Sequence, residues 1–292
     1  MANTGGSVND EAITAWNTVL FEKFVRFRPL LTSGLAHHGS EALRLTPPPS
    51  SGSLLDIGCG FGDSTIELGR RLGKHGQATG VDAAENFIEV ARRDAEEAGL
   101  DNVRFLSLDV QSEPLGGPYD FAFSRFGTMF FSSPVAALRN VRRSLKPGAP
   151  LVLVVWRKRE DNDWLYAAEQ CVRSIVPERE KQESDAPTCG PGPFSMSGAD
   201  LVSDQLIASG FSEIRFNRND AEIRIGRDLD DAVEFALALG PAGEILRLAG
   251  DAADQYRERV LLGLREVLSR FERAGGVFAP SSTWLISARA AG

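Results

Sequence analysis

The chain has 292 residues, of which 42% are hydrophobic and 25% are charged, and its formal net charge is -8. This composition is typical of a folded globular protein and excludes a chain that is disordered throughout, and the length suits one elaborated α/β domain. Proteins that bind nucleic acid concentrate Lys and Arg, so the acidic balance argues against a nucleic-acid partner and favours a small-molecule substrate.

The N-terminal residues lack the basic and apolar regions of a signal peptide, and no apolar run approaches membrane-spanning length. The three cysteines, Cys59, Cys171 and Cys189, show neither a disulfide framework nor zinc-type spacing, which fits a reducing compartment. We therefore expect a cytoplasmic protein with no membrane partner. The sequence leaves the oligomeric state open, with a homodimer as one option.

Residues 1–50 are predicted to form an N-terminal helical lid. Apolar side chains of residues 11–27 recur three or four positions apart on one helical stripe: Trp16, Leu20, Phe24 and Phe27. A second helical stretch runs to about Leu45, and the Pro/Ser/Gly run at 47–52 ends it. The second predicted unit, residues 51–292, begins in this connector.

After the connector, short β-like runs alternate with amphipathic helices. The helices begin near Ser64, Glu85 and Pro134, and the runs predicted as strands are 53–57, 77–82, 103–108, 119–124 and 150–156. This alternation predicts parallel strands joined by crossover helices, in a doubly wound, Rossmann-like α/β sheet.

The C-terminal half departs from this alternation. Residues 157–197 are predicted to be a cap insertion containing a helix at 164–175, followed by a helix at 198–209. Strands are predicted at 212–217 and 283–288, with a mainly helical insertion at 220–280 between them.

A glycine-rich turn, Asp-Ile-Gly-Cys-Gly-Phe-Gly-Asp at 56–63, follows the first predicted strand and precedes a helix. Glycines in this context let a ligand approach the backbone. A dinucleotide fingerprint needs Gly or Ala where this chain has Asp63, whose carboxylate repels phosphate. Asp56 adds a second negative charge, which suits a ligand with an ammonium and a sulfonium, as in S-adenosylmethionine. The residues of this turn that are predicted to contact S-adenosylmethionine are Asp56, Gly58, Cys59 and Gly60.

Two further carboxylates end the next strands, where ligands bind in open parallel sheets. We expect Asp82 to accept hydrogen bonds from the ribose hydroxyls and Asp109 to accept one from the adenine amine, with Ala83 and Val110 flanking the base. A single aspartate at such a place is as often a helix cap or a solvated turn residue. Three at successive strand ends favour a ligand site.

With these motifs the chain resembles the class I S-adenosylmethionine-dependent methyltransferases, in particular the bacterial branch similar to ubiquinone/menaquinone-biosynthesis methyltransferases. The resemblance covers roughly residues 54–156 and rests on five motifs: DIGCGFGDST, GVDAAE, LDV, SRFGTMFF and LKPG. It implies S-adenosylmethionine as cofactor with S-adenosylhomocysteine as product, and Ser124 as a further cofactor contact. It also implies a seven-stranded sheet that ends in an antiparallel hairpin.

Methyl transfer from a sulfonium is an in-line displacement, so the protein mainly has to align the acceptor and exclude water. The residues predicted to line the acceptor pocket are Phe126, Met129, Phe130, Trp156 and Trp164, each with core packing as the alternative. Arg125 is a candidate for orienting an acidic acceptor or for pairing with a nearby carboxylate. His37 and His38 are candidate general bases, with a surface position as the alternative. The sequence shows no cluster of carboxylates near the predicted acceptor pocket, so we expect no metal ion there.

Two other classes of protein stay open as alternatives. An NAD(P)-dependent oxidoreductase shares the glycine turn and a later acid, but Asp63 and the lack of a Tyr-x-x-x-Lys pair argue against it. A non-catalytic, cofactor-binding interaction protein is compatible with the sequence. Adenine methylation in DNA is disfavoured, because no Asn/Asp-Pro-Pro-Tyr/Phe segment follows the fourth strand.

Overall fold

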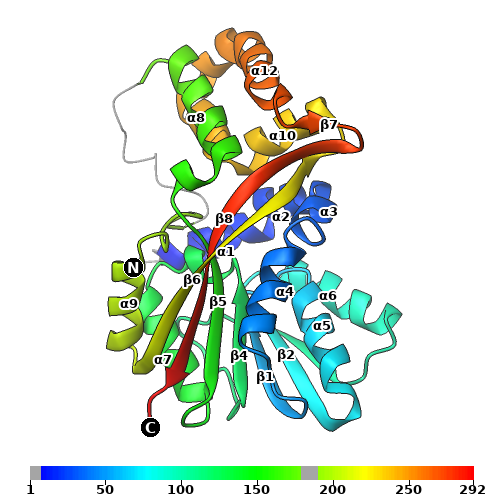
Figure 1. The fold of residues 1–292 in the computed structure, drawn as a ribbon, viewed down its shortest axis with the longest axis vertical. Helices are drawn as coiled ribbons and strands as arrows, with labels where there is room; N and C mark the ends of the chain where they lie inside the picture. The colour runs from blue at the N-terminus through cyan, green and yellow to red at the C-terminus, as the bar shows by residue number, and fades with distance from the viewer. Residues whose placement is uncertain (1–7, 179–189) are drawn as a thin grey trace, which may run out of the picture.

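The computed structural model describes residues 8–178 and 190–292. Within these residues, eight strands form one mixed sheet, in which strands β1 to β5 are parallel and β8 runs antiparallel to both of its neighbours, β5 and β6 (Figure 1). The order across the sheet is β3 (Val103–Ser107), β2 (Gly76–Asp82), β1 (Gly52–Ile57), β4 (Phe121–Arg125), β5 (Pro150–Trp156), β8 (Gly276–Ala290) and β6 (Phe211–Gly226), and β7 (Glu272–Arg273) pairs with β8. The predicted fold class is confirmed.

Helices cover both faces of the sheet, which explains why its central strands are hydrophobic without alternation. In β1, Leu54 packs in one core cluster and its neighbour Leu55 packs in another, and both are fully buried. Figure 1 shows α4, α5 and α6 on one side of the sheet and α7 and α9 on the other. Their bounds are α4 Ala36–Leu45, α5 Asp63–Leu72, α6 Glu85–Glu97, α7 Pro134–Ser144 and α9 Ala199–Ala208.

The N-terminal layer contains more and shorter helices than predicted. The single helix expected over 11–27 is divided into α1 (Val8–Asn17) and α2 (Val19–Arg26), and α3 (Arg28–Leu31) follows before α4. The chain turns at Thr18, whose backbone is non-helical and whose hydroxyl donates to the carbonyl of Thr14 at 2.8 Å. Such local hydrogen bonds compete with the helical ladder and explain the break.

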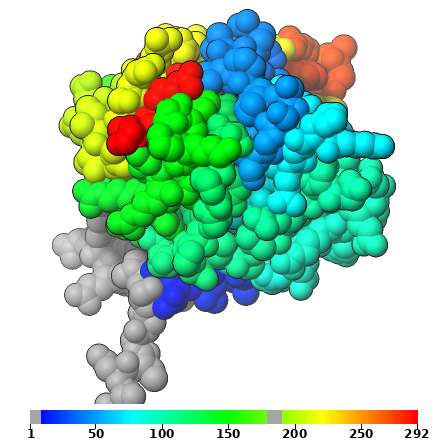
Figure 2. All heavy atoms as spheres, turned by 90° about the horizontal axis from the view of Figure 1, so that it is seen from below, coloured from blue at the N-terminus to red at the C-terminus, as the bar shows by residue number. Residues whose placement is uncertain are grey.

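The β6–β8 hairpin is much longer than the strands predicted at 212–217 and 283–288. Its inner part continues the sheet, because residues 283–289 of β8 also pair with β5. Residues 277–282 of β8 pair with β6 but not with β5, so a two-stranded ribbon extends beyond the sheet. Seen from below, the red C-terminal end lies between yellow and green segments, as expected for a strand between β6 and β5 (Figure 2).

Beyond the sheet the ribbon leads to a helical cap (Figure 1). Helices α10 (Leu229–Leu239), α11 (Pro241–Ala249) and α12 (Ala253–Ser269) connect its strands and pack against α8 (Asp163–Ile175). The helical part between the strands is therefore shorter than the predicted 220–280. Short 3-10 helices are η1 (Gly73–His75), η2 (Thr128–Phe130), η3 (Arg159–Asp161) and η5 (Gly250–Ala252). No helix in the described ranges has the length and apolar character needed to cross a membrane.

Candidate functional site

A cavity of about 930 Å³ lies at the carboxyl ends of the strands, between the N-terminal helices and the cap. Its walls come from the glycine turn, the ends of β2, β4 and β5, the helices α1 to α3, and the cap helices α8, α10 and α11. The volume is near the upper end of the range for ligand pockets, about 300–1,000 Å³. One space can therefore hold a nucleoside-sized cofactor and a second molecule.

The glycine turn exposes bare backbone to this cavity. Gly58, Gly60 and Gly62 have positive φ angles of 62°, 52° and 77°, a conformation that favours glycine. A Cβ on Gly58 would lie 2.8 Å from the Cα of Gly127, at the end of β4, so two backbones meet there without side chains. The predicted contacts Gly58, Cys59 and Gly60 all line the cavity.

Asp82 fixes the glycine turn as well as lining the cavity. One carboxylate oxygen accepts from the backbone N–H of Gly60 and the other from that of Ala84, both at 3.0 Å. Burial raises the pKa of this carboxyl, and the backbone donors lower it in part. With the backbone N–H of Ala83 as a further donor, about one of the four lone-pair sites of the carboxylate stays available to a ligand hydroxyl. Ala83, Asp109 and Val110, predicted on the same side, also line the cavity.

Asp56 and Ser124 do not lie where the sequence placed them. Asp56 is fully buried behind the turn, where one oxygen accepts from the hydroxyls of Ser64 and Thr65 at 2.7 and 2.6 Å and the other has no partner. Burial raises its pKa to about 6. Ser124 donates to the carbonyl of Ile57 at 2.7 Å and so ties β4 to β1. Neither is among the cavity-lining residues, because both point into the packed sheet.

Asp63 and Arg125 form an ion pair in the cavity wall. Asp63 begins α5 and is about one-third exposed, and Arg125 ends β4 with 11% of its side chain exposed. A second guanidinium nitrogen donates weakly to the carbonyl of Thr32 at 3.4 Å. Pairing with a carboxylate was one of the two roles predicted for Arg125.

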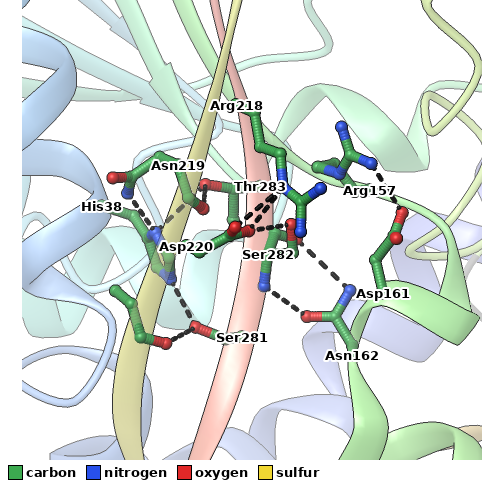
Figure 3. A network of polar contacts seen from close by, with 11 residues as sticks. His38, Arg157, Asp161, Asn162, Arg218, Asn219, Asp220, Ser281, Ser282 and Thr283 are labelled. Carbon is green, nitrogen blue, oxygen red and sulfur yellow. Dashed lines mark hydrogen bonds and ion pairs between the residues drawn. The ribbon is translucent and has the colours of Figure 1, made fainter.

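The two histidine candidates are corrected by the structure. His37 is exposed on α4, and His38 is fully buried, so neither lines the cavity. The imidazole of His38 contacts both strands of the β6–β8 hairpin, with Nε2 2.8 Å from the Ser281 hydroxyl and Nδ1 2.7 Å from the Asn219 amide (Figure 3). A helical spacing cannot show which of two adjacent histidines turns inward.

The network around His38 determines its protonation. The Ser281 hydroxyl donates to the carbonyl of Ala221 at 2.7 Å, so it accepts from Nε2–H of His38. Nδ1 then accepts from the Asn219 amide, with the Thr283 hydroxyl also 3.0 Å away, which makes His38 a neutral imidazole. Burial, with His37 and Arg125 nearby, lowers its pKa to about 4, against a small opposing effect of Asp220. This histidine joins α4 to the hairpin and does not act as a base at the acceptor.

His38→Gln is expected to make the protein less sensitive to acid. Because the folded-state pKa of about 4 lies below the usual 6.5, the contribution of neutral His38 is complete above pH 6.5 and is lost as the pH falls toward 4. The difference in unfolding free energy between wild type and variant should shrink by about 3 kcal/mol over that range. Denaturant unfolding at pH 4 to 7 measures it.

His37→Gln serves as the control, since this exposed neighbour lacks the buried network. Asp56, whose raised pKa gives the opposite trend between about pH 4 and 6, is the same in all three proteins and cancels from the differences. A difference that stays constant with pH would show that His38 is not held neutral.

Aromatic side chains form the wall at the end of β4 and β5. Phe126 has a positive φ of 62° and stacks on Trp156, with ring centroids 4.5 Å apart. Trp164 of the cap stacks on Phe235 at 5.5 Å. These residues, with Met129 and Phe130, line the cavity where the sequence predicted the acceptor pocket.

Several lining residues were not predicted from the sequence. Helix α1 contributes Asn9, Ala12, Ile13 and Trp16, and the cap contributes much of α10 and α11. In the sequence, Asn9 is a polar residue at the start of an amphipathic helix, and nothing in that position indicates that it lines a cavity. Among residues 8–178 and 190–292, no group of three His, Cys, Asp or Glu side chains is placed to hold a metal ion. Cys189 lies outside the described residues.

Comparison with known proteins agrees with this geometry. Residues 54–148 match the family model described as methyltransferase domain. A demethylmenaquinone methyltransferase of Listeria welshimeri is 27% identical over 138 residues, which are 47% of this chain and 58% of that protein. The chain thus spans little more than half the length of this curated relative.

Solved structures share the fold at low sequence identity. The YcgJ protein of Bacillus subtilis has a TM-score of 0.57 and 18% identity, over 88% of this chain and 99% of that one. Phosphoethanolamine N-methyltransferase 2 of Haemonchus contortus, solved with phosphomonomethylethanolamine and S-adenosylhomocysteine, has a TM-score of 0.57 and 15% identity, over 99% of this chain and 61% of that one. Residues 54–148 thus match a methyltransferase domain by sequence, and the solved structures show that the chain as a whole shares their fold.

Proposed function

We propose that the protein binds S-adenosylmethionine and transfers its methyl group to a small-molecule acceptor. The observation that carries this proposal is the continuity of the cavity. The glycine turn, Asp82 and Asp109 lie at one part of its wall, and the stacked rings of Phe126 and Trp156 lie at another. The name of the Listeria relative supports a small-molecule acceptor for this chain as well.

The residues present fit such a cofactor. Gly58, Gly60 and Gly127 line the cavity with backbone alone, so a ligand can approach closely there, and Asp82 keeps acceptor capacity for a ribose hydroxyl. When bound, S-adenosylmethionine supplies a methyl group activated by a sulfonium. Asp82, Ala83, Asp109 and Val110 would hold its nucleoside.

We assign the amino-acid end of the cofactor to the Asp63–Arg125 ion pair, and not to Asp56 as predicted from the sequence. An amino-acid group carries an ammonium beside a carboxylate, and this pair offers a carboxylate beside a guanidinium in the cavity wall. Asp63 would receive the ammonium and Arg125 the carboxylate. The aromatic wall excludes water and presents the acceptor, so the chain contributes alignment rather than a covalent nucleophile.

The cytoplasm is the proposed compartment. Cys59 and Cys171 are free thiols, which supports a reducing environment.

Calorimetric titration of the purified protein with S-adenosylmethionine, S-adenosylhomocysteine and NADH tests the proposed function. Binding of the first two without NADH is the expected result. Binding of NADH alone would overturn the proposal in favour of an oxidoreductase. Methyl transfer from labelled S-adenosylmethionine to a panel of small molecules then distinguishes an enzyme from a binding protein.

The variants Arg125→Gln and Asp63→Asn test the amino-acid end of the site. S-adenosylhomocysteine should bind about ten- to a hundredfold more weakly, because one charged hydrogen bond is lost. Methylthioadenosine lacks the amino-acid group, so its affinity for both variants should equal its affinity for the wild-type protein. Arg44→Gln, which removes an exposed arginine paired with Glu41 on α4, is the charge-matched control. Equal losses for both ligands would show that the pair only shapes the glycine turn.

A further inference from the structure

Helix α1 contacts the carboxylate that the proposed function gives to the adenine amine. Asn9 Nδ2 donates to Asp109 Oδ2 at 2.6 Å across 100 positions of sequence. Both residues line the cavity. A side chain of the N-terminal layer thus lies at the place of the nucleobase.

The hydrogen-bonding capacity of Asp109 is already used. A carboxylate offers about four lone-pair sites, two on each oxygen. Oδ2 accepts from Asn9 and from the Ser112 hydroxyl at 2.9 Å, and Oδ1 accepts from the backbone N–H of Gln111 at 3.0 Å and from its side-chain amide at 3.3 Å. A ligand amine therefore has to displace one of these donors.

The orientation of the Asn9 amide follows from a backbone donor. The N–H of Ser133 donates to Gln111 Oε1 at 2.7 Å, so the Gln111 Nε2 faces the other way and donates to Asn9 Oδ1 at 2.7 Å. With its oxygen held by Gln111, Asn9 turns its N–H₂ group to Asp109. It presents a donor beside an acceptor, as adenine does with its amine and N1.

We propose that the Asn9 carboxamide stands in for the adenine edge and must leave Asp109 before the nucleobase of the cofactor binds. This inference rests on the proposed function. Asn9 belongs to the same helix face as Ala12, Ile13 and Trp16, which also line the cavity. Entry of the nucleobase is therefore coupled to displacement of Asn9 on α1, and the helix competes with its own ligand.

The test compares two ligands on the full-length protein: S-adenosylhomocysteine and its 6-deamino analogue, in which hydrogen replaces the adenine amine. Asn9→Ala frees one acceptor site of Asp109, so S-adenosylhomocysteine should bind about tenfold more tightly, with a faster association rate. The 6-deamino analogue still has to move Asn9 aside but gains no hydrogen bond to the freed Asp109 oxygen, so its gain in affinity should be clearly smaller than that of S-adenosylhomocysteine. Calorimetry gives the affinities and stopped-flow fluorescence the rates.

Asn17→Ala is the matched control on the same helix. Asn17 ties α1 to Asn86, whose backbone N–H donates to the Asn17 side chain at 3.1 Å, and makes no bond to Asp109. Its loss loosens α1 while leaving Asn9 in place. Asn9→Ser, which keeps a polar but shorter side chain, repeats the test if the alanine variant is poorly folded.

Three results would overturn the proposal. Weaker binding of S-adenosylhomocysteine to Asn9→Ala and Asn9→Ser would show that Asn9 helps to bind the ligand. Equal gains for both ligands, or an equal gain in Asn17→Ala, would show that general loosening of α1 is the cause. Failure of the wild-type protein to bind S-adenosylhomocysteine would instead refute the proposed function.

Discussion

Asp82→Ala is expected to weaken the binding of S-adenosylhomocysteine by about a hundredfold. The variant removes a charged acceptor for the ribose hydroxyls. It also releases the N–H groups of Gly60 and Ala84, both held at 3.0 Å, so the glycine turn loses its anchor on β2. Calorimetric titration of the folded variant measures the effect.

Asp120→Ala is a matched control, because Asp120 plays the same local role away from the cavity. It accepts from the backbone N–H of Ser53 at 2.9 Å and from Lys146 at 2.6 Å, just before β4 begins. We expect a loss of stability in this variant and wild-type affinity. An Asp82→Ala protein that bound as tightly as wild type would place the ribose elsewhere.

Gly127→Ala is expected to destabilise the protein by about 1–3 kcal/mol and to reduce cofactor affinity by about a hundredfold. The backbone of Gly127 is helical, with φ of -84°, so alanine causes no dihedral strain. The added Cβ would lie 2.9 Å from both the Cα of Gly58 and the carbonyl oxygen of Ile57. Since both contacts are backbone, the turn after β1 and the end of β4 have to move apart.

Gly198→Ala isolates the steric cause of this effect. Gly198 has nearly the same φ, -85°, but its Cβ would meet only Leu201, at 3.8 Å. Thermal unfolding and calorimetry on both variants compare the two sites. Retained affinity in Gly127→Ala would mean that the close approach of the two backbones does not shape the cofactor site.

The parallel part of the fold could be predicted from the sequence because its signals are local. Hydrophobic runs, helix stops and the glycine turn recur in order, and each predicted strand up to Trp156 corresponds to an observed one. The length of the β6–β8 hairpin was underestimated because its local signal is incomplete. In β6 residues 218–222 are exposed or only partly buried and mostly polar, which interrupts the apolar signal beyond Asn217, although pairing continues to Gly226 and Ile223 and Ile225 are buried.

Residues of the candidate site could be predicted where a polar side chain directly follows a strand. They could not be predicted where the position of the side chain depends on tertiary packing. Asp82 and Asp109 follow their strands and reach the cavity. Asp56 has the same local signature, yet it is fully buried behind the turn and bonded to Ser64 and Thr65. The place of Asn9 depends on how α1 folds back over a residue 100 positions away, which no local pattern encodes.

The ribbon formed by β6 and β8 connects the sheet to a separate group of helices that supply part of the cavity wall. The chain enters and leaves the helices α10 to α12 through this ribbon, between Gly226 and Gly276, and α10 and α11 contribute residues to the cavity wall. A different set of helices joined at the same two glycines would leave every strand of the parallel sheet untouched. The part of the cap formed by α10 to α12 could therefore be exchanged as one module without altering the residues at the carboxyl ends of β1 to β5.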